Sequence, residues 1–195
     1  MKKNILFLSC LTLSLLLAGS TSPYKEQIDK GNLRYIRSKY YAAIEDPAGA
    51  DSLYHFIENE YGSDYNNYNP IVRAYYACLI GLKGKFNNNP YTKYKYVNDG
   101  IRKIDSAVSE FEYCMEIRFL RFSFYHYLPD LFGIDRKREQ DRQIITDMFK
   151  KQDYTFVPKD IQADMIEFTI NTGRLEEKTA DTLGTILKGL REDNE

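Results

Sequence analysis

The sequence predicts an all-α fold, with about eight helices that pack as antiparallel pairs. Along most of the chain, apolar residues recur at the three- and four-residue spacing of one helix face. Signals for the start of a helix accompany them, in the form of a Ser or Asn directly followed by Pro. The Ser or Asn can cap the helix, and Pro suits the first turn because the N–H that it lacks would have no partner there. Sustained alternation of apolar and polar residues, the sign of half-buried strands, is lacking.

The composition fits one soluble globular domain. The 195 residues are 43% hydrophobic and 28% charged, with a formal net charge of −1. These values exclude collagen-like, coiled-coil-only and strongly disordered chains. A domain of this size needs no disulfide framework, because it buries roughly 70% of its unfolded surface.

The first twenty residues have the layout of a secretory signal peptide. Lys2 and Lys3 precede an apolar run over 5–18, which is shorter than the ~20 residues that span a bilayer. Small residues then favour cleavage after Ser20, which leaves 21–195 as a single helical domain in the periplasm or outside the cell. The alternatives are a buried N-terminal helix and a lipoprotein anchored through Cys10.

The first two expected helices lie before residue 62. Ser22-Pro23 is typical of a helix start and leads into Ile28 and Ile36 on one side. Asp46-Pro47 is expected to interrupt this helix, and Asp51 is expected to cap the next one. That second helix carries Leu53, Phe56, Ile57 and Tyr61 and ends at Gly62.

Two Asn-Pro pairs open the next two helices. Asn69-Pro70 starts a helix that ends near Gly84, and Asn89-Pro90 starts a longer one that runs to about Phe111. In each pair the Asn side chain can accept from the free N–H groups of the first turn.

The second half of the chain predicts four more helices. The run 116–127 is apolar on nearly every face, so we expect it to be central and buried, with an end at Leu128-Pro129. Three amphipathic segments follow, at 135–151, from Pro158 to Gly173, and around 183–190.

Part of this pattern resembles tetratricopeptide-type repeats, which are pairs of helices over roughly 34–40 residues. The segments 74–82 and 100–108 resemble the two helices of one unit, and 116–121 resembles the start of the next. The chain is also similar to small exported bacterial helical proteins without known activity. The resemblance implies a right-handed array with a binding or scaffolding role and no catalytic residues. An irregular helical bundle is the alternative fold, because it has the same periodicity.

Sequence motifs of catalysis, metal binding and phosphate binding are absent. The chain has no H-E-x-x-H, C-x-x-C, G-x-S-x-G or P-loop sequence, so we expect no cofactor, no metal and no catalytic residue. His55 and Glu58 share a helix face, but a surface position explains them better than a metal site. After cleavage the chain has a net negative charge, which argues against a nucleic-acid partner. The sequence contains no second apolar run long enough to predict a membrane span.

His126 is the residue best suited to a special role. It stands in an aromatic run, and Asp130 could orient its ring, with Ser123 or Cys114 as a nucleophile. The simpler interpretation is a core histidine that hydrogen-bonds a carbonyl or a tyrosine.

Two more pairs of residues have competing interpretations. Arg118 and Arg121 stand three residues apart on the most apolar helix, so they either bind an anion or form structural ion pairs with Glu110, Glu112 and Glu116. Cys78 and Cys114 have apolar neighbours, which favours buried free thiols over a disulfide.

The abundance of tyrosine suggests a binding function. Tyr occurs 17 times, and its large apolar ring with a polar tip suits either helix packing or peptide recognition. We therefore expect an exported, non-enzymatic protein that binds a protein or peptide of the cell envelope; the alternative is a small periplasmic enzyme that uses His126. The expected groove contains Tyr75, Tyr76, Tyr94, Arg118, Arg121 and His126. The sequence leaves the oligomeric state open.

Overall fold

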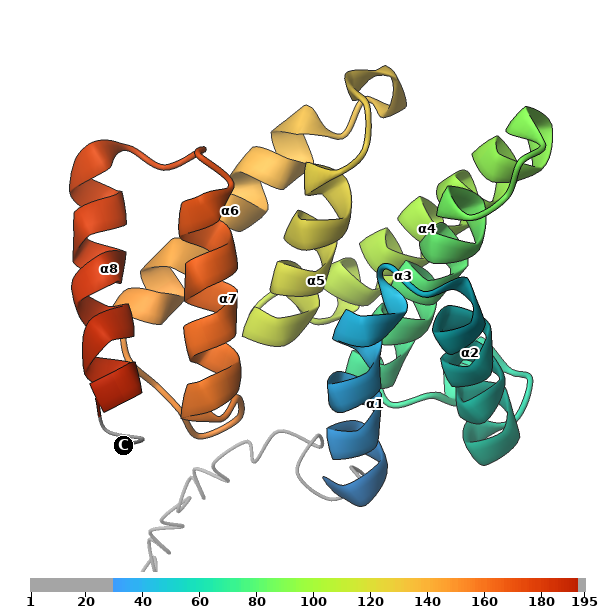
Figure 1. Cartoon of the computed structure of the whole chain (residues 1–195), viewed down its shortest axis with the longest axis horizontal. Helices are drawn as coiled ribbons and strands as arrows, with labels where there is room; N and C mark the ends of the chain where they lie inside the picture. Colours follow the sequence, from blue (N-terminus) through green and yellow to red (C-terminus); the bar gives the residue numbers. More distant parts are fainter. Residues whose placement is uncertain (1–29, 193–195) are drawn as a thin grey trace, which may run out of the picture.

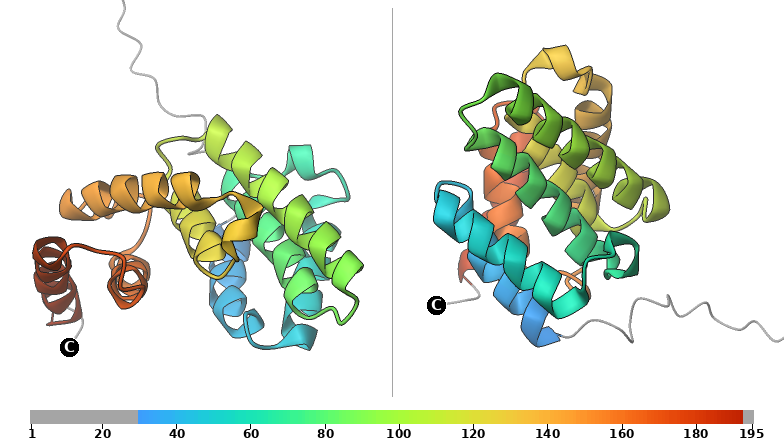
Figure 2. Two further views of the ribbon diagram at one scale, coloured as in Figure 1. Left: turned by 90° about the horizontal axis from the view of Figure 1, so that it is seen from above. Right: turned by 90° about the vertical axis from the view of Figure 1, so that its right-hand side faces the viewer.

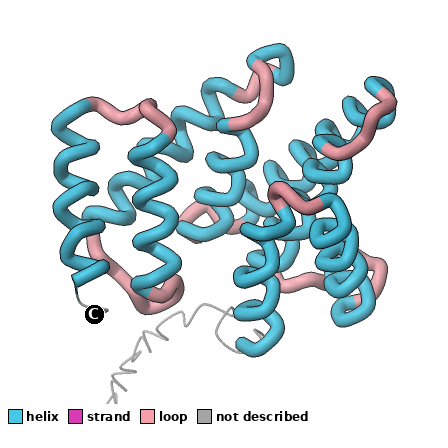
Figure 3. Tube along the Cα trace, viewed as in Figure 1, coloured by secondary structure: helices cyan, strands magenta, loops and turns pink. Residues whose placement is uncertain are grey.

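The computed structural model describes residues 30–192, and within them the chain forms eight α-helices and no strand (Figures 1 and 3). The predicted all-α fold is confirmed. The helices are α1 (Lys30–Ala43), α2 (Pro47–Tyr61), α3 (Pro70–Lys85), α4 (Pro90–Glu110), α5 (Met115–His126), α6 (Asp135–Lys150), α7 (Lys159–Asn171) and α8 (Glu177–Glu192). Two short 3-10 turns, η2 (Tyr65–Asn67) and η3 (Asp130–Phe132), lie in the connections. The predicted signal peptide, its cleavage site at Ser20, Cys10 and the helix start at Ser22-Pro23 lie outside the described residues.

Consecutive helices pair in opposite directions, as α1 with α2, α3 with α4, α5 with α6, and α7 with α8 (Figure 1). The α3–α4 pair has the most extensive contact, and α5 packs on both of its helices. Seen from above, α1 and α7 lie on the same side of α5 (Figure 2).

The helix starts follow the predicted chemistry, with one correction. The Asn69 side chain accepts from the Ile71 N–H at 3.0 Å, and Asn89 accepts from Thr92 at 3.1 Å. The expectation that Asp51 caps the second helix is wrong. Asp46 is the cap, because its carboxylate accepts from the Ala48 N–H at 3.0 Å and the following proline occupies the first turn.

α5 lies between two apolar clusters and contributes to both. Ile117 and Leu120 belong to the cluster formed with α1 to α4. Phe119 and Phe122 belong to the cluster formed with α6 to α8. The expectation of a central, buried helix is confirmed, because all four side chains are buried.

α3 and α4 approach closely where both helices carry small residues. A Cβ added to Gly100 would lie 2.9 Å from the Ala77 carbonyl oxygen and 3.1 Å from the Gly81 backbone nitrogen. These neighbours are backbone atoms, so no side chain can move to make room. The helix pair therefore requires glycine at position 100.

No helix in the described part of the chain combines the length and the apolar character that a membrane span requires.

Candidate functional site

The six residues of the expected groove do not form one surface. Tyr75, Tyr76, Arg118 and Arg121 are buried in the helix interfaces. Only Tyr94 and His126 reach the surface, where Tyr94 stacks on Phe132 and His126 contacts other rings. Within the described residues, neither Tyr94 nor His126 forms a hydrogen bond or an ion pair with any of the four buried residues.

Arg118 and Arg121 form structural ion pairs, but not with the glutamates expected from the sequence. Arg118 Nη1 donates to Asp141 Oδ1 at 2.7 Å. Arg121 donates to both Asp141 oxygens, at 2.6 and 2.8 Å, and to Asp105 at 2.9 Å. Glu112 takes part only through its backbone carbonyl, which accepts from Arg118 Nε. The two guanidinium groups are thus neutralised and hold α5 to α4 and α6.

A second buried acid holds the opposite side of α5. Glu116 is fully buried and accepts from Arg37 Nε of α1 at 2.7 Å and from the Tyr75 hydroxyl of α3 at 2.8 Å. Burial and the Glu116 charge raise the pKa of Tyr75 well above its usual value, so the hydroxyl stays a donor. Tyr75 therefore acts as a structural donor within the helix interfaces.

Tyr76 belongs to a tyrosine cluster between α2, η2 and α3. Its hydroxyl lies 2.9 Å from a Glu58 oxygen and 2.7 Å from the Tyr54 hydroxyl, and its ring stacks on Tyr54 at 4.8 Å. The Lys83 ammonium lies 3.4 Å from the centre of the Tyr54 ring. Part of the tyrosine richness of the sequence is thus used for helix packing.

His126 is half-buried at the end of α5. Its Nδ1 accepts from Arg174 Nε at 3.3 Å, and this bond replaces the hydrogen bond to a carbonyl or a tyrosine that the simpler interpretation expected. Burial and the nearby charges of Arg174 and Arg138 lower its pKa, which keeps the imidazole neutral. Asp130 pairs with Arg138, and the Ser123 hydroxyl donates to the Leu120 carbonyl. Within the described residues, no acid or nucleophile hydrogen-bonds His126, so no observation favours the enzyme alternative.

The exposed aromatic surface next to His126 joins three helices. The Tyr127 ring, which is 68% exposed, lies 4.9 Å from the His126 ring and 6.2 Å from Phe168 of α7. Tyr41 of α1 is 39% exposed, and the burial of the rest of its side chain, together with the charges of Asp164 (α7) and Glu116 (α5), raises its pKa. We call the surface formed by Tyr41, Tyr127, Phe168 and Asp164 the α1–α5–α7 face.

The α7 side of this face carries uncompensated negative charge. Partial burial and the carboxylates of Asp160 and Glu167 raise the pKa of Asp164. Glu167 pairs with Arg191 at 2.6 Å, whereas Asp160 and Asp164 form no ion pair within the described residues. Sequence analysis missed this site because Tyr41 and Asp164 are far apart in the chain; the i, i+4, i+7 spacing of the three acids was the available signal.

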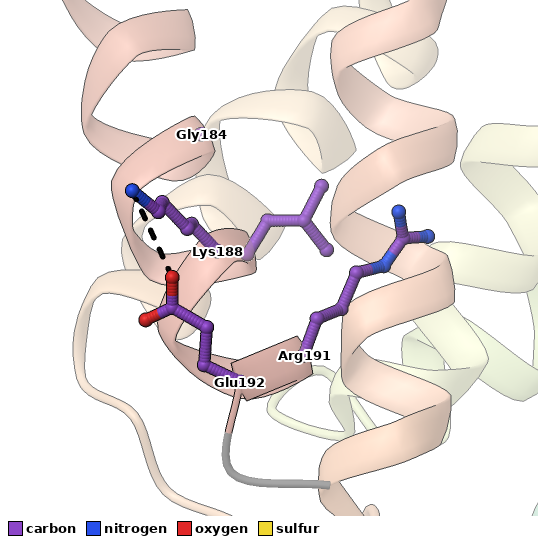
Figure 4. Close-up of a pocket in the computed structure, with 5 residues that line it drawn as sticks. Gly184, Lys188, Arg191 and Glu192 are labelled. Atoms are coloured by element: carbon purple, nitrogen blue, oxygen red, sulfur yellow. Dashed lines mark ion pairs between the residues drawn. The ribbon is translucent and has the colours of Figure 1, made fainter. Parts of the chain in front are cut away.

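Two shallow pockets elsewhere hold no comparable chemistry. The pocket on α8 is lined by Gly184, Leu187, Lys188, Arg191 and Glu192 (Figure 4). Its charged groups are already paired: Lys188 with Glu192 at 3.7 Å, and Arg191 with α7. The other pocket lies where α2, α3 and α4 meet, and Lys83 and Asp51 in its lining pair with each other at 3.3 Å. The described residues contain no group of three or more potential metal ligands.

Both cysteines of the described chain are free thiols, as the sequence favoured. Burial raises the pKa of Cys78 to about 12 and that of Cys114 to about 11. A thiol with such a pKa is protonated at neutral pH and is a poor nucleophile.

Comparisons of the chain with protein-family models, with curated proteins and with solved structures find no match.

Proposed function

We propose that this protein is an exported, non-enzymatic helical protein that binds a protein or peptide of the cell envelope through the α1–α5–α7 face. The observation that carries the proposal is the exposed contact of Tyr127 with Phe168 of α7, at 6.2 Å, together with Tyr41 of α1, whose hydroxyl is influenced by the charge of Asp164. Tyr41, Tyr127 and Phe168 offer rigid aromatic surface, and Asp164 offers an exposed carboxylate that forms no ion pair within the described residues. Such aromatic side chains contribute much of the binding energy in protein interfaces.

The charge of this face favours a partner segment that carries lysine or arginine. Asp160 and Asp164 would attract a cationic side chain, and Tyr41 would offer its ring face to the same group. This role agrees with the tetratricopeptide-type resemblance of 70–125, which implies binding and needs no cofactor. Export, with cleavage after Ser20, remains a proposal that rests on the signal-like sequence of residues 1–20.

The binding proposal is tested with the mature chain, 21–195, as bait in an envelope fraction under mild crosslinking. The double variant Tyr41→Ser/Tyr127→Ser should lose the captured partner, because truncation of aromatic anchors typically costs 2 kcal/mol or more of binding, about a thirtyfold loss. Asp164→Asn should weaken capture and reduce its sensitivity to salt.

The matched control is Tyr113→Ser, because Tyr113 is 86% exposed and lies between α4 and α5, away from this face. Equal capture by the double variant and the control would exclude the α1–α5–α7 face as the binding surface. N-terminal sequencing of protein from the native host tests export separately; a chain that keeps Met1 or carries a lipid on Cys10 would contradict cleavage after Ser20.

A further inference from the structure

A second exposed apolar surface lies where the start of α4 meets the connection between α5 and α6. Leu131 of η3 is 74% exposed, and the adjacent Phe132 stacks on Tyr94 of α4 with ring centres 5.7 Å apart. Tyr91 stands one turn earlier on α4 and is 79% exposed. We call these four residues the α4–η3 patch. It unites the start of α4 with the turn between α5 and α6.

The patch lies on a protruding side of the molecule. The start of α4 and the turn between α5 and α6 are the two highest points of the molecule in the view of Figure 1. A flat surface placed across them would therefore meet the chain at the start of α4 and at the turn that contains η3. This shape differs from the α1–α5–α7 face, where α5 lies back between two flanking helices (Figure 2).

The charges around the patch are positive and unpaired. Lys93 and Lys95 alternate with the two tyrosines on α4, and Arg136 follows η3; all three are exposed and make no ion pair within the described residues. The acids nearest in sequence, Asp130 and Asp135, share the single guanidinium group of Arg138, so three unpaired cations stand against one uncompensated carboxylate and the net charge is positive. The surface therefore combines exposed aromatic and leucine side chains with free cationic groups.

We infer that the α4–η3 patch docks the protein on a bilayer surface that carries anionic lipid headgroups. Tyrosine rings prefer the boundary between headgroups and acyl chains, where the ring is apolar and the hydroxyl stays hydrated. Leu131 adds an apolar side chain that can enter the same layer. Each lysine or arginine near an anionic surface strengthens binding about fivefold, which corresponds to about 1 kcal/mol. The protruding shape and the complementary charge favour a flat anionic surface over a peptide.

The inference is tested by sedimentation of the mature chain with vesicles of phosphatidylcholine alone or with phosphatidylglycerol added. We expect binding only to the anionic vesicles, with a decrease as salt rises. Tyr91→Ser/Leu131→Ser should abolish binding, and Lys93→Gln/Lys95→Gln should weaken it roughly thirtyfold, because two cations are lost. All seven side chains that these tests and their controls change are solvent-exposed, so circular dichroism should show unchanged folding.

Two controls keep the result specific. Tyr113→Ser removes an equally exposed ring elsewhere, and Lys151→Gln/Lys188→Gln removes the same charge at the far ends of α6 and α8. Both controls should bind as the unaltered chain does. Absence of vesicle binding, equal binding to neutral vesicles, or equal losses in the control variants would each overturn the inference. Because Tyr41 and Tyr127 are unchanged here, failure of this test leaves the partner-capture result unaffected.

Discussion

Replacement of Asp141 by asparagine should destabilise the protein severely. The Asp141 carboxylate is fully buried and accepts three hydrogen bonds from two guanidinium groups, at 2.6, 2.7 and 2.8 Å. Asparagine has nearly the same shape but no charge and only one accepting oxygen. Arg121 would then keep only Asp105 as a carboxylate partner, and Arg118 would remain buried with none of those described.

The expected cost is large compared with the total stability. Loss of one partner from a buried ion pair costs about 3–5 kcal/mol, out of about 5–15 kcal/mol for a typical domain. A domain of this size loses roughly 2–4 °C of Tm for each kcal/mol, so Tm should fall by about 6–20 °C. Thermal and urea unfolding followed by circular dichroism measure the change.

The control for this substitution is Glu139→Gln on the same helix. Glu139 is exposed and pairs with Arg142, and exposed pairs contribute about 0–1 kcal/mol. The reasoning would be refuted if Asp141→Asn cost less than about 1 kcal/mol, or no more than the control. Either result would mean that water reaches the two arginines and that the network does not hold α5 in place.

Four further predictions follow from single residues. Leu120→Ala should cost about 2–5 kcal/mol in urea melts, because Leu120 is buried in the larger cluster; a cost under ~1 kcal/mol would contradict its central position. Gly100→Ala should destabilise the protein by about 1–3 kcal/mol, because the added Cβ meets backbone atoms of α3. Gly184→Ala should stabilise it by about 0.5–1 kcal/mol, because no atom lies within 4 Å of the added Cβ. Stabilisation by Gly100→Ala together with destabilisation by Gly184→Ala would refute the packing argument. The pKa of His126 is lower in the folded protein than in the unfolded chain, so the unfolded chain binds more protons as the pH falls below about 6.5. The free energy of unfolding should therefore fall on acidification from pH 7.5 to 5.5, and it should fall less in His126→Gln. Thermal melts of both proteins at both pH values measure the difference. Cys78 should resist alkylation at pH 7 until the protein is denatured; rapid labelling of the native protein, located by mass spectrometry, would show that the thiol is accessible.

The sequence predicted what local chemistry determines. Asn69-Pro70 and Asn89-Pro90 start helices because cap and proline act within one turn, and the apolar run 116–127 is buried because it has no polar face to expose. These signals need no knowledge of the tertiary structure. The cap at Asp46 was missed because an Asp-Pro pair can either end one helix or begin the next.

Partner choice was beyond the sequence. Arg118 was expected to pair with a nearby glutamate, but its carboxylate partner is Asp141 on the next helix. Helical periodicity specifies which face a residue occupies, not which helix lies against that face. The same limit explains Tyr75 and Tyr76: both were expected to line a groove, and both are buried because α3 is surrounded by other helices.

The position of α5 has a consequence for the order in which a growing chain can fold. Its buried acid pairs with Arg37, which is synthesised long before it, whereas its two arginines pair with Asp141, which is synthesised after it. A chain that has emerged only as far as residue 126 therefore lacks Asp141, so Arg121 has only Asp105 as a carboxylate partner and Arg118 has none of those described. It also exposes Phe119 and Phe122, whose apolar neighbours lie in α6 to α8. The helix pairs α1–α2 and α3–α4 can form early, but α5 reaches its final position only after α6 has been synthesised. Folding of the first half of the chain is therefore completed only when the second half is present.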